Sequence, residues 1–273
     1  VAASVLFISV TVTSAYAKNQ ADRIRIHYVA PDDPQLRKIH DILRERRVLE
    51  RLQEFLSPYR LPRDLDVQLT DCDGESDAWY GDDKITICYE YINVLWQRMP
   101  AETTASGVAP IDTVIGPFMD TTLHEFAHAL FDMLKIPVLG REEDAADQVG
   151  AYIYLQLGIE EAKRLITGTA HAFLVEAESA GHQPTIADYA DEHGTPAQRA
   201  FNILCIAYGA DTRRFSDLVE KFKMPAERAE VCEDEYEQIQ DAYEALIGPY
   251  IDQEMAEELF DRTWILKKPV QNQ

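Results

Sequence analysis

Two histidines lie four residues apart in the segment TTLHEFAHAL, residues 121–130, and a glutamate follows the first of them. On an α-helix, His124 and His128 project from the same face and can bind one metal ion from successive turns. Glu125 projects beside that face, where its carboxylate can take a proton from a water bound to the metal. The pattern H-E-x-x-H is a zinc-hydrolase signature for this geometric reason.

The other residues of this segment favour a buried helix. They are uncharged where a surface helix would carry Lys, Glu or Gln at some positions. These residues are Phe126, Ala127, Ala129 and Leu130. The segment therefore indicates a helix at the floor of a cleft.

A second acidic pair follows in GREEDAADQVGAY, where Asp147 comes four residues after Glu143 and shares its helix face. A catalytic zinc ion usually has three protein ligands and an open position for water. Glu143 can complete the ligand set, and Asp147 can hydrogen-bond the outer nitrogen of a ligand histidine. Glu142 leaves the third ligand ambiguous by one position. We favour Glu143 because only it has an aspartate at the fourth following position.

H-E-x-x-H followed by E-x-x-A-D resembles the gluzincins, zinc metallopeptidases in which two histidines and a downstream glutamate bind the metal. Over about residues 30–250 the chain is similar to a family of exported bacterial metallopeptidases of unknown physiological role. The segments that carry this similarity are ITICYEYI, GREEDAAD, QRAFNILCIAYG and RAEVCEDEYEQI.

The resemblance implies a zincin-like α+β fold, Zn²⁺ as cofactor and a peptide or protein substrate. Carried over to this chain, it makes His124, His128 and Glu143 the metal ligands. Glu125 becomes the general base, and Asp147 supports a ligand histidine from outside. A donor to the oxyanion of the reaction must come from elsewhere. The candidates are His193, Tyr208 and Arg199, each of which is more commonly a structural residue.

Three other interpretations remain. A di-iron carboxylate protein would need a second E-x-x-H element, and the sequence contains none. A binding protein without turnover would be free to lose Glu125, which is intact. In a helical structural protein the histidines would be ordinary core residues, and the two matched spacings would be a coincidence. The remaining histidines, expected on the surface or in the core, are His27, His40, His171 and His182.

The elements that must position these residues divide the chain into two parts. Residues 33–59 predict one amphipathic helix, and residues 64–72 and 84–92 predict an antiparallel pair of strands. The second strand could supply the edge along which an extended peptide lies. After a connector at 100–110, helices are predicted at about 111–135, 141–157, 159–180, 195–208 and 225–247, with breaks at Pro137, Gly158, Gly181 and Gly209. We therefore expect an α+β part over 18–110 and a helical part over 111–273, which form one catalytic unit.

The composition excludes some partners. The chain of 273 residues has 48 acidic and 26 basic residues and a net charge of −22. Binding to nucleic acid requires a basic surface, and an anionic membrane would repel this chain. We expect neither as a partner, and the sequence does not indicate an oligomeric state.

The first 17 residues are apolar and end in Ala15-Tyr16-Ala17, a small-x-small site typical of signal-peptide cleavage. We expect a mature chain from near Lys18, exported to the periplasm or secreted; the alternative is a buried N-terminal strand. Four cysteines fit an oxidising compartment. We favour the pairs Cys72–Cys88 and Cys205–Cys232, each joining neighbouring elements, over the other two connectivities and over free thiols.

Overall fold

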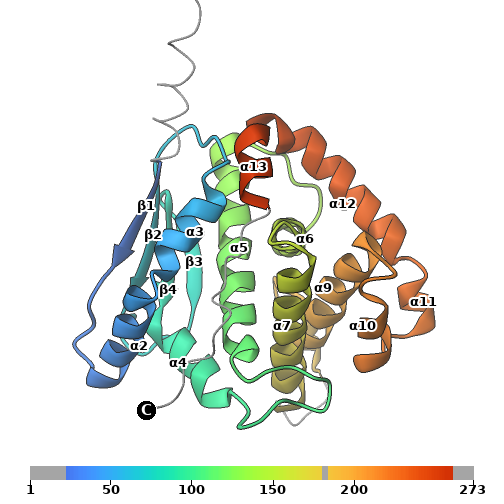
Figure 1. The fold of residues 1–273 in the computed structure, drawn as a ribbon, viewed down its shortest axis with the longest axis horizontal. Helices are drawn as coiled ribbons and strands as arrows, with labels where there is room; N and C mark the ends of the chain where they lie inside the picture. Colours follow the sequence, from blue (N-terminus) through green and yellow to red (C-terminus); the bar gives the residue numbers. More distant parts are fainter. Residues whose placement is uncertain (1–22, 180–183, 261–273) are drawn as a thin grey trace, which may run out of the picture.

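A computed structural model describes residues 23–179 and 184–260, so the expected signal segment lies outside the described residues. The fold is α+β, as predicted, with a small sheet at one side of a larger group of helices (Figure 1). The strands are β1 (Ile24–Tyr28), β2 (Leu65–Thr70), β3 (Ala78–Gly81) and β4 (Lys84–Cys88). They lie in the order β1-β2-β4-β3; β1, β2 and β4 are parallel, and β3 is antiparallel to β4.

The helices in the first part of the chain are α2 (Pro34–Glu45), α3 (Val48–Leu56) and α4 (Tyr89–Arg98). Those that follow are α5 (Asp112–Leu134), α6 (Glu142–Leu155), α7 (Ile159–Ser179), α8 (Ile186–Ala190), α9 (Pro196–Ala210), α10 (Ser216–Lys221), α11 (Ala226–Ala229), α12 (Cys232–Leu246), η1 (Gly248–Tyr250) and α13 (Gln253–Phe260). Helix α5 lies between the sheet and the other long helices (Figure 1), packing against β3 and β4 on one side and α6 and α7 on the other. This position explains why its sequence is apolar on nearly all faces.

The predicted antiparallel pairing of the two strands was wrong. Strand β2 does alternate, with Leu65, Val67 and Leu69 fully buried, but it pairs with β4 in parallel. The antiparallel partner of β4 is β3, which precedes it through a turn at Asp82 and Asp83. Both turn residues have positive φ, as a type I′ hairpin turn requires.

The predicted edge strand was also wrong. Strand β4 lies inside the sheet, and β3 forms the edge beside α5. The segment KITICYEYI is a strand only to Cys88, because α4 begins at Tyr89.

Two of the predicted helices are each divided. Residues 33–59 form α2 and α3, separated at Arg47, whose φ is 55°. Leu43 and Leu49 are six residues apart, an interval that does not fit one continuous apolar stripe. Residues 225–247 form α11 and α12. The other predicted helices agree with α5, α6, α7 and α9 to within a few residues.

Gly209, predicted as a helix break, lies inside α9. A Cβ atom there would meet the carbonyl oxygen of Cys232 at 2.0 Å. This glycine therefore permits the close approach of α9 and the start of α12. Gly181, another predicted break, is outside the described residues.

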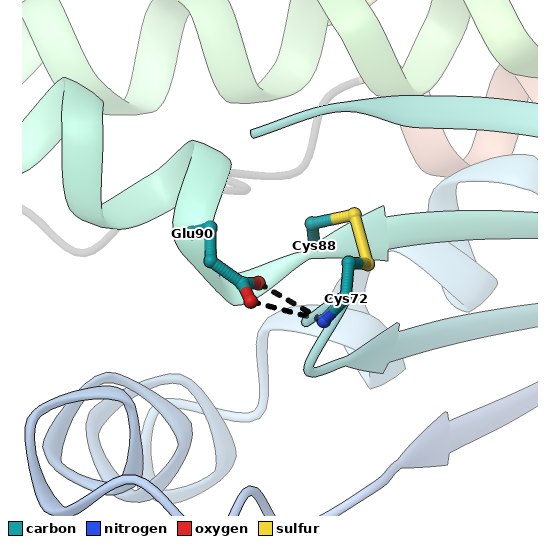
Figure 2. Close-up of side chains that lie close together, drawn as sticks. All are labelled: Cys72, Cys88 and Glu90. Carbon is teal, nitrogen blue, oxygen red and sulfur yellow. Dashed lines mark hydrogen bonds between the residues drawn. A yellow bond between two sulfur atoms is a disulfide. The ribbon is translucent and has the colours of Figure 1, made fainter. Parts of the chain in front are cut away.

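Both favoured disulfides are present. Cys72–Cys88 joins the segment that follows β2 to the end of β4, and Cys205–Cys232 joins α9 to α12, with Cα–Cα distances of 5.5 and 5.0 Å. Beside the first bridge, Glu90 accepts hydrogen bonds from the backbone N–H of Cys72 (Figure 2), at 3.0 and 3.2 Å. Disulfides of this kind form in oxidising compartments.

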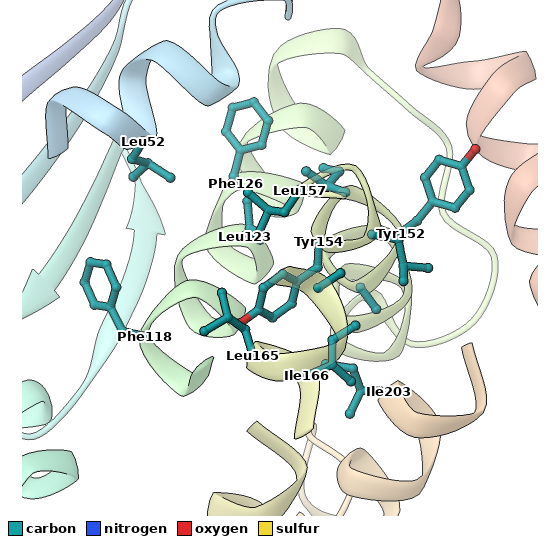
Figure 3. Packing of buried hydrophobic residues seen from close by; sticks show 14 of the residues in the cluster. Leu52, Phe118, Leu123, Phe126, Tyr152, Tyr154, Leu157, Leu165, Ile166 and Ile203 are labelled. Carbon is teal, nitrogen blue, oxygen red and sulfur yellow. The ribbon is translucent and has the colours of Figure 1, made fainter. Parts of the chain in front are cut away.

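One hydrophobic core extends from the sheet side into the helices. Figure 3 shows Leu52 of α3 and Phe126 of α5 on one side of this core and Leu165 of α7 on the other. Tyr154 of α6 is fully buried and donates a hydrogen bond to the carbonyl oxygen of Gly116, at 3.0 Å. The core thus fixes α6 against α5. Within the described residues, none of the helices combines the length and hydropathy needed to cross a membrane.

Candidate metal centre

The predicted metal-binding residues lie where α6 packs against α5. Gly150 of α6 is placed at this contact, since a Cβ atom on it would be only 3.1 Å from the backbone nitrogen of His124. Close approach of the two helices brings the first turn of α6, with Glu142 and Glu143, to the face of α5 that carries His124 and His128.

Three of the predicted ligand atoms converge. Glu143 Oε2 lies 3.0 Å from His124 Nε2 and 3.3 Å from His128 Nε2, and the two Nε2 atoms are 3.1 Å apart. All three candidate ligand atoms lie within 4.8 Å of one another. The structure thus brings together the three residues that the sequence placed on two separate helices.

The outer nitrogen of each histidine contacts a carboxylate. His124 Nδ1 lies 2.7 Å from Asp147 Oδ1, and His128 Nδ1 lies 2.9 Å from Glu142 Oε1. When each Nδ1 donates its proton to its carboxylate, each Nε2 turns a lone pair toward the other and toward Glu143. Three acceptors so close repel one another unless a proton on His124 or a metal cation lies between them. The residues therefore fit a metal ion, and two nitrogens with one carboxylate oxygen are a ligand set that zinc accepts.

The charges around His124 also favour a cation. Burial opposes protonation of this imidazole, but its hydrogen bonds to Asp147 and Glu143 outweigh burial and raise its pKa to about 9. The hydrogen bond from His124 lowers the pKa of Glu143 to about 2. For Asp147, burial acts in the opposite direction, yet contacts with His124 and Arg199 hold its pKa well below the usual range.

Glu125 lies on the side of α5 that faces the sheet. Its side chain is buried, and burial raises its pKa above the ordinary value. The nearby backbone of Tyr80 in the edge strand β3 partly offsets this rise in pKa. The candidate base is therefore held between the metal-binding helix and the sheet.

His193 joins the cluster from the loop between α8 and α9. Its Nε2 lies 2.8 Å from Glu143 Oε2, and its side chain is 39% exposed, so one face stays open to solvent. Arg141 holds this loop by donating hydrogen bonds to the backbone carbonyls of Asp191 and Glu192. From the sequence His193 was only one of three possible donors, because its spacing from the motif carries no local signal.

The other two possible donors lie elsewhere. Arg199 is behind Asp147, where it forms a two-pronged ion pair. Tyr208 packs, partly buried, against the hydrophobic core. Neither contact is with Glu143.

The remaining described histidines have other surroundings. His27 is exposed and pairs with Asp66, His40 is buried and pairs with Asp41, and His171 is half-buried on α7. His182 is outside the described residues. A second group of potential ligands, Cys72, Cys88 and Glu90, is not a metal site because both cysteines are in a disulfide.

The chain belongs to the protein family described as "putative metallopeptidase", which matches residues 28–247. Comparisons with curated proteins and with solved structures gave no match. Family membership supports a peptidase-like function and implies a metal cofactor. The three converging ligand atoms are a site at which this chain could bind it.

Proposed function

We propose that this protein is an exported zinc-dependent peptidase of the gluzincin type, with peptides or proteins as substrates. In this proposal His124, His128 and Glu143 bind Zn²⁺. The observation that carries it is the convergence of three potential ligand atoms, together with the carboxylates of Asp147 and Glu142 that hold the two histidines from outside. The two disulfides support export, because such bonds persist in oxidising compartments.

Zinc bound by His124, His128 and Glu143 would supply the Lewis acidity needed to activate a water molecule and to polarise the scissile carbonyl. Glu125 accepts the proton of that water and later gives it to the leaving amine. Burial suits Glu125 to this task because it raises the proton affinity of the carboxylate.

His193 is the best placed of the three candidate oxyanion donors. Its ring lies at the open side of the cluster, within 2.8 Å of Glu143, and is part-exposed. From that position it can donate a hydrogen bond to the substrate oxygen that becomes negative during attack. Arg199, in contrast, is largely enclosed behind Asp147.

The edge strand β3 is the proposed support for the substrate. An extended peptide can add to a free sheet edge through backbone hydrogen bonds. Strand β3 is the edge nearest α5, and the backbone of its residue Tyr80 is near enough to Glu125 to affect the pKa of that carboxyl. A peptide lying along β3 would therefore pass the candidate base, as in a zincin-like architecture.

Zinc content and hydrolysis of a peptide library test the proposal on the purified chain. We expect stoichiometric zinc and turnover in the unmutated protein, retained zinc without turnover in Glu125→Gln, and loss of both in His128→Ala. His27→Ala is the control, because His27 is an exposed histidine of the sheet. Zinc without turnover in the unmutated protein would favour a binding protein, and absence of zinc would refute the proposal.

A further inference from the structure

Arg199 lies in the first turn of α9, on the far side of Asp147 from His124. Its Nε donates to Asp147 Oδ2 at 2.9 Å, and its Nη2 donates to Oδ1 at 2.8 Å. The guanidinium also lies over the ring of Phe173 in α7, 4.7 Å from the ring centre. The side chains of Arg199 and Asp147 are only 18% and 19% exposed. This arginine is therefore held by groups from two other helices.

The two-pronged contact determines the plane of the Asp147 carboxylate. A guanidinium is a planar fork whose two N–H groups match both oxygens of a carboxylate, whereas an ammonium group is a point charge without this match. Asp147 Oδ1 accepts from Arg199 and also contacts His124 Nδ1 at 2.7 Å. Rotation of the carboxylate away from Arg199 would also break the contact with His124.

The guanidinium of Arg199 also interacts with a second buried carboxylate, that of Asp120. Asp120, one turn before His124 on α5, and Asp147 on α6 line one small cavity with Arg199 and Asn202. Both carboxylates are in the largely buried space around the guanidinium and interact with its charge. Arg199 thus faces an acid from each of the two helices that carry the candidate ligands, although burial outweighs its effect on Asp120 and raises the pKa of that carboxyl to about 7.

We propose that Arg199 is a positioning residue of the metal centre: it holds Asp147 in the orientation that aligns His124 with the metal. This inference rests on the proposed function, since it assumes that His124 is a metal ligand. It adds a third helix, α9, to the elements on which metal affinity depends. Outer partners of ligand histidines commonly change metal affinity by about 10–100-fold when they are altered.

Zinc affinity, measured by competition with a chromophoric chelator, tests this role on the full chain. The variants are Arg199→Lys, which keeps the charge and loses the fork, Asp147→Asn, and the double variant. We expect each single change to weaken zinc binding by about 10–100-fold. If Arg199 acts through Asp147, the double variant should bind within about twofold of Asp147→Asn alone.

Arg228→Lys is the matched control. Arg228 forms a similar two-pronged pair with Glu235, at 2.7 Å for both contacts, and its side chain is 24% exposed. It joins α11 to α12 and also donates to Asn202 Oδ1 of α9 at 3.3 Å, but within the described residues it forms no hydrogen bond to Asp147 or to a candidate metal ligand. We expect Arg228→Lys to leave zinc affinity unchanged, and the visible spectrum of the Co²⁺-substituted protein to change in Arg199→Lys but not in this control.

Unchanged zinc affinity in Arg199→Lys would overturn the inference, and so would losses that simply add in the double variant. If Arg199→Lys does not fold, the zinc affinity of Phe173→Leu is measured instead. This variant keeps the arginine and removes the aromatic ring against which its guanidinium packs. We then expect about a two- to fivefold loss of zinc affinity, and no loss would overturn the inference. Absence of zinc from the unmutated protein would instead refute the proposed function.

Discussion

The two candidate ligand histidines are supported in different ways. His124 contacts Asp147, which is 19% exposed and is itself held by Arg199. His128 contacts Glu142, which is 57% exposed and lies in the first turn of α6. One support is an enclosed network that reaches a third helix, and the other is a single carboxylate open to water. Because water screens exposed charges, the two supports should differ in strength although their hydrogen bonds are similar in length.

The largest difference should appear in folding stability. Asp147→Ala leaves Arg199 and His124 without their shared carboxylate, and removal of one partner from a buried ion pair costs about 3–5 kcal/mol. Glu142→Ala should cost at most about 1 kcal/mol because that carboxylate is exposed. Urea unfolding of the metal-free proteins measures both values. Equal losses of unfolding free energy would show that the enclosed network stabilises the fold no more than the exposed carboxylate does.

The pH dependence of the unfolding free energy of the metal-free protein tests the buried support of His124. The pKa of His124 is raised from its ordinary 6.5 to about 9, so the folded state binds its proton more tightly than the unfolded state. The resulting stability is fully present below pH 6.5 and is lost as the pH rises through 9, by up to about 3 kcal/mol. Unfolding free energies between pH 6 and 10 measure this loss. Asp147→Asn should flatten the profile, and a profile that is equally steep in this variant would contradict the assignment to the buried network.

Metal removal should have the next largest effect. A ligand that binds only the folded state stabilises it by about 2.7 kcal/mol when its concentration is 100 times the dissociation constant. We therefore expect EDTA to lower the melting temperature of the zinc-loaded protein and zinc to restore it. His128→Ala should show neither response. A response that persists in this variant would place the stabilising metal at another site.

The smallest effect is expected at the exposed support. Glu142→Gln keeps an acceptor for His128 Nδ1 and removes only a screened charge, so zinc affinity should fall about two- to fivefold. Asp144→Asn is the control, since Asp144 lies on the same turn, has a side chain that is 44% exposed and pairs with Arg141. Chelator competition distinguishes the two variants. A loss as large as that of Asp147→Asn would mean that both histidines depend equally on their outer partners.

Much of the candidate metal centre could be predicted because its signals are local. His124 and His128 share a helix face by their four-residue spacing, and the same rule joins Glu143 to Asp147. The choice between Glu142 and Glu143 was harder. Adjacent residues on a helix point about 100° apart, and which one faces α5 depends on how α6 is rotated against it.

The sheet was predicted less well for a related reason. The alternation of β2 is a local property, and that strand was predicted correctly. Whether it pairs in parallel with β4 depends on the path of residues 71–83 between them, which includes the edge strand β3. Strand β3 has only four residues and no alternating burial pattern to reveal it.

By itself, the sequence determined the helix that carries the two histidines, the acidic helix after it and the cysteine pairs, because short-range spacing and neighbouring elements dictate these features. Only the tertiary structure decided that Arg199 and His193 join the centre and that Glu142 faces the outer side of His128. These contacts join elements far apart in the chain. Their geometry follows from how the helices pack around one core, and no local periodicity records that packing.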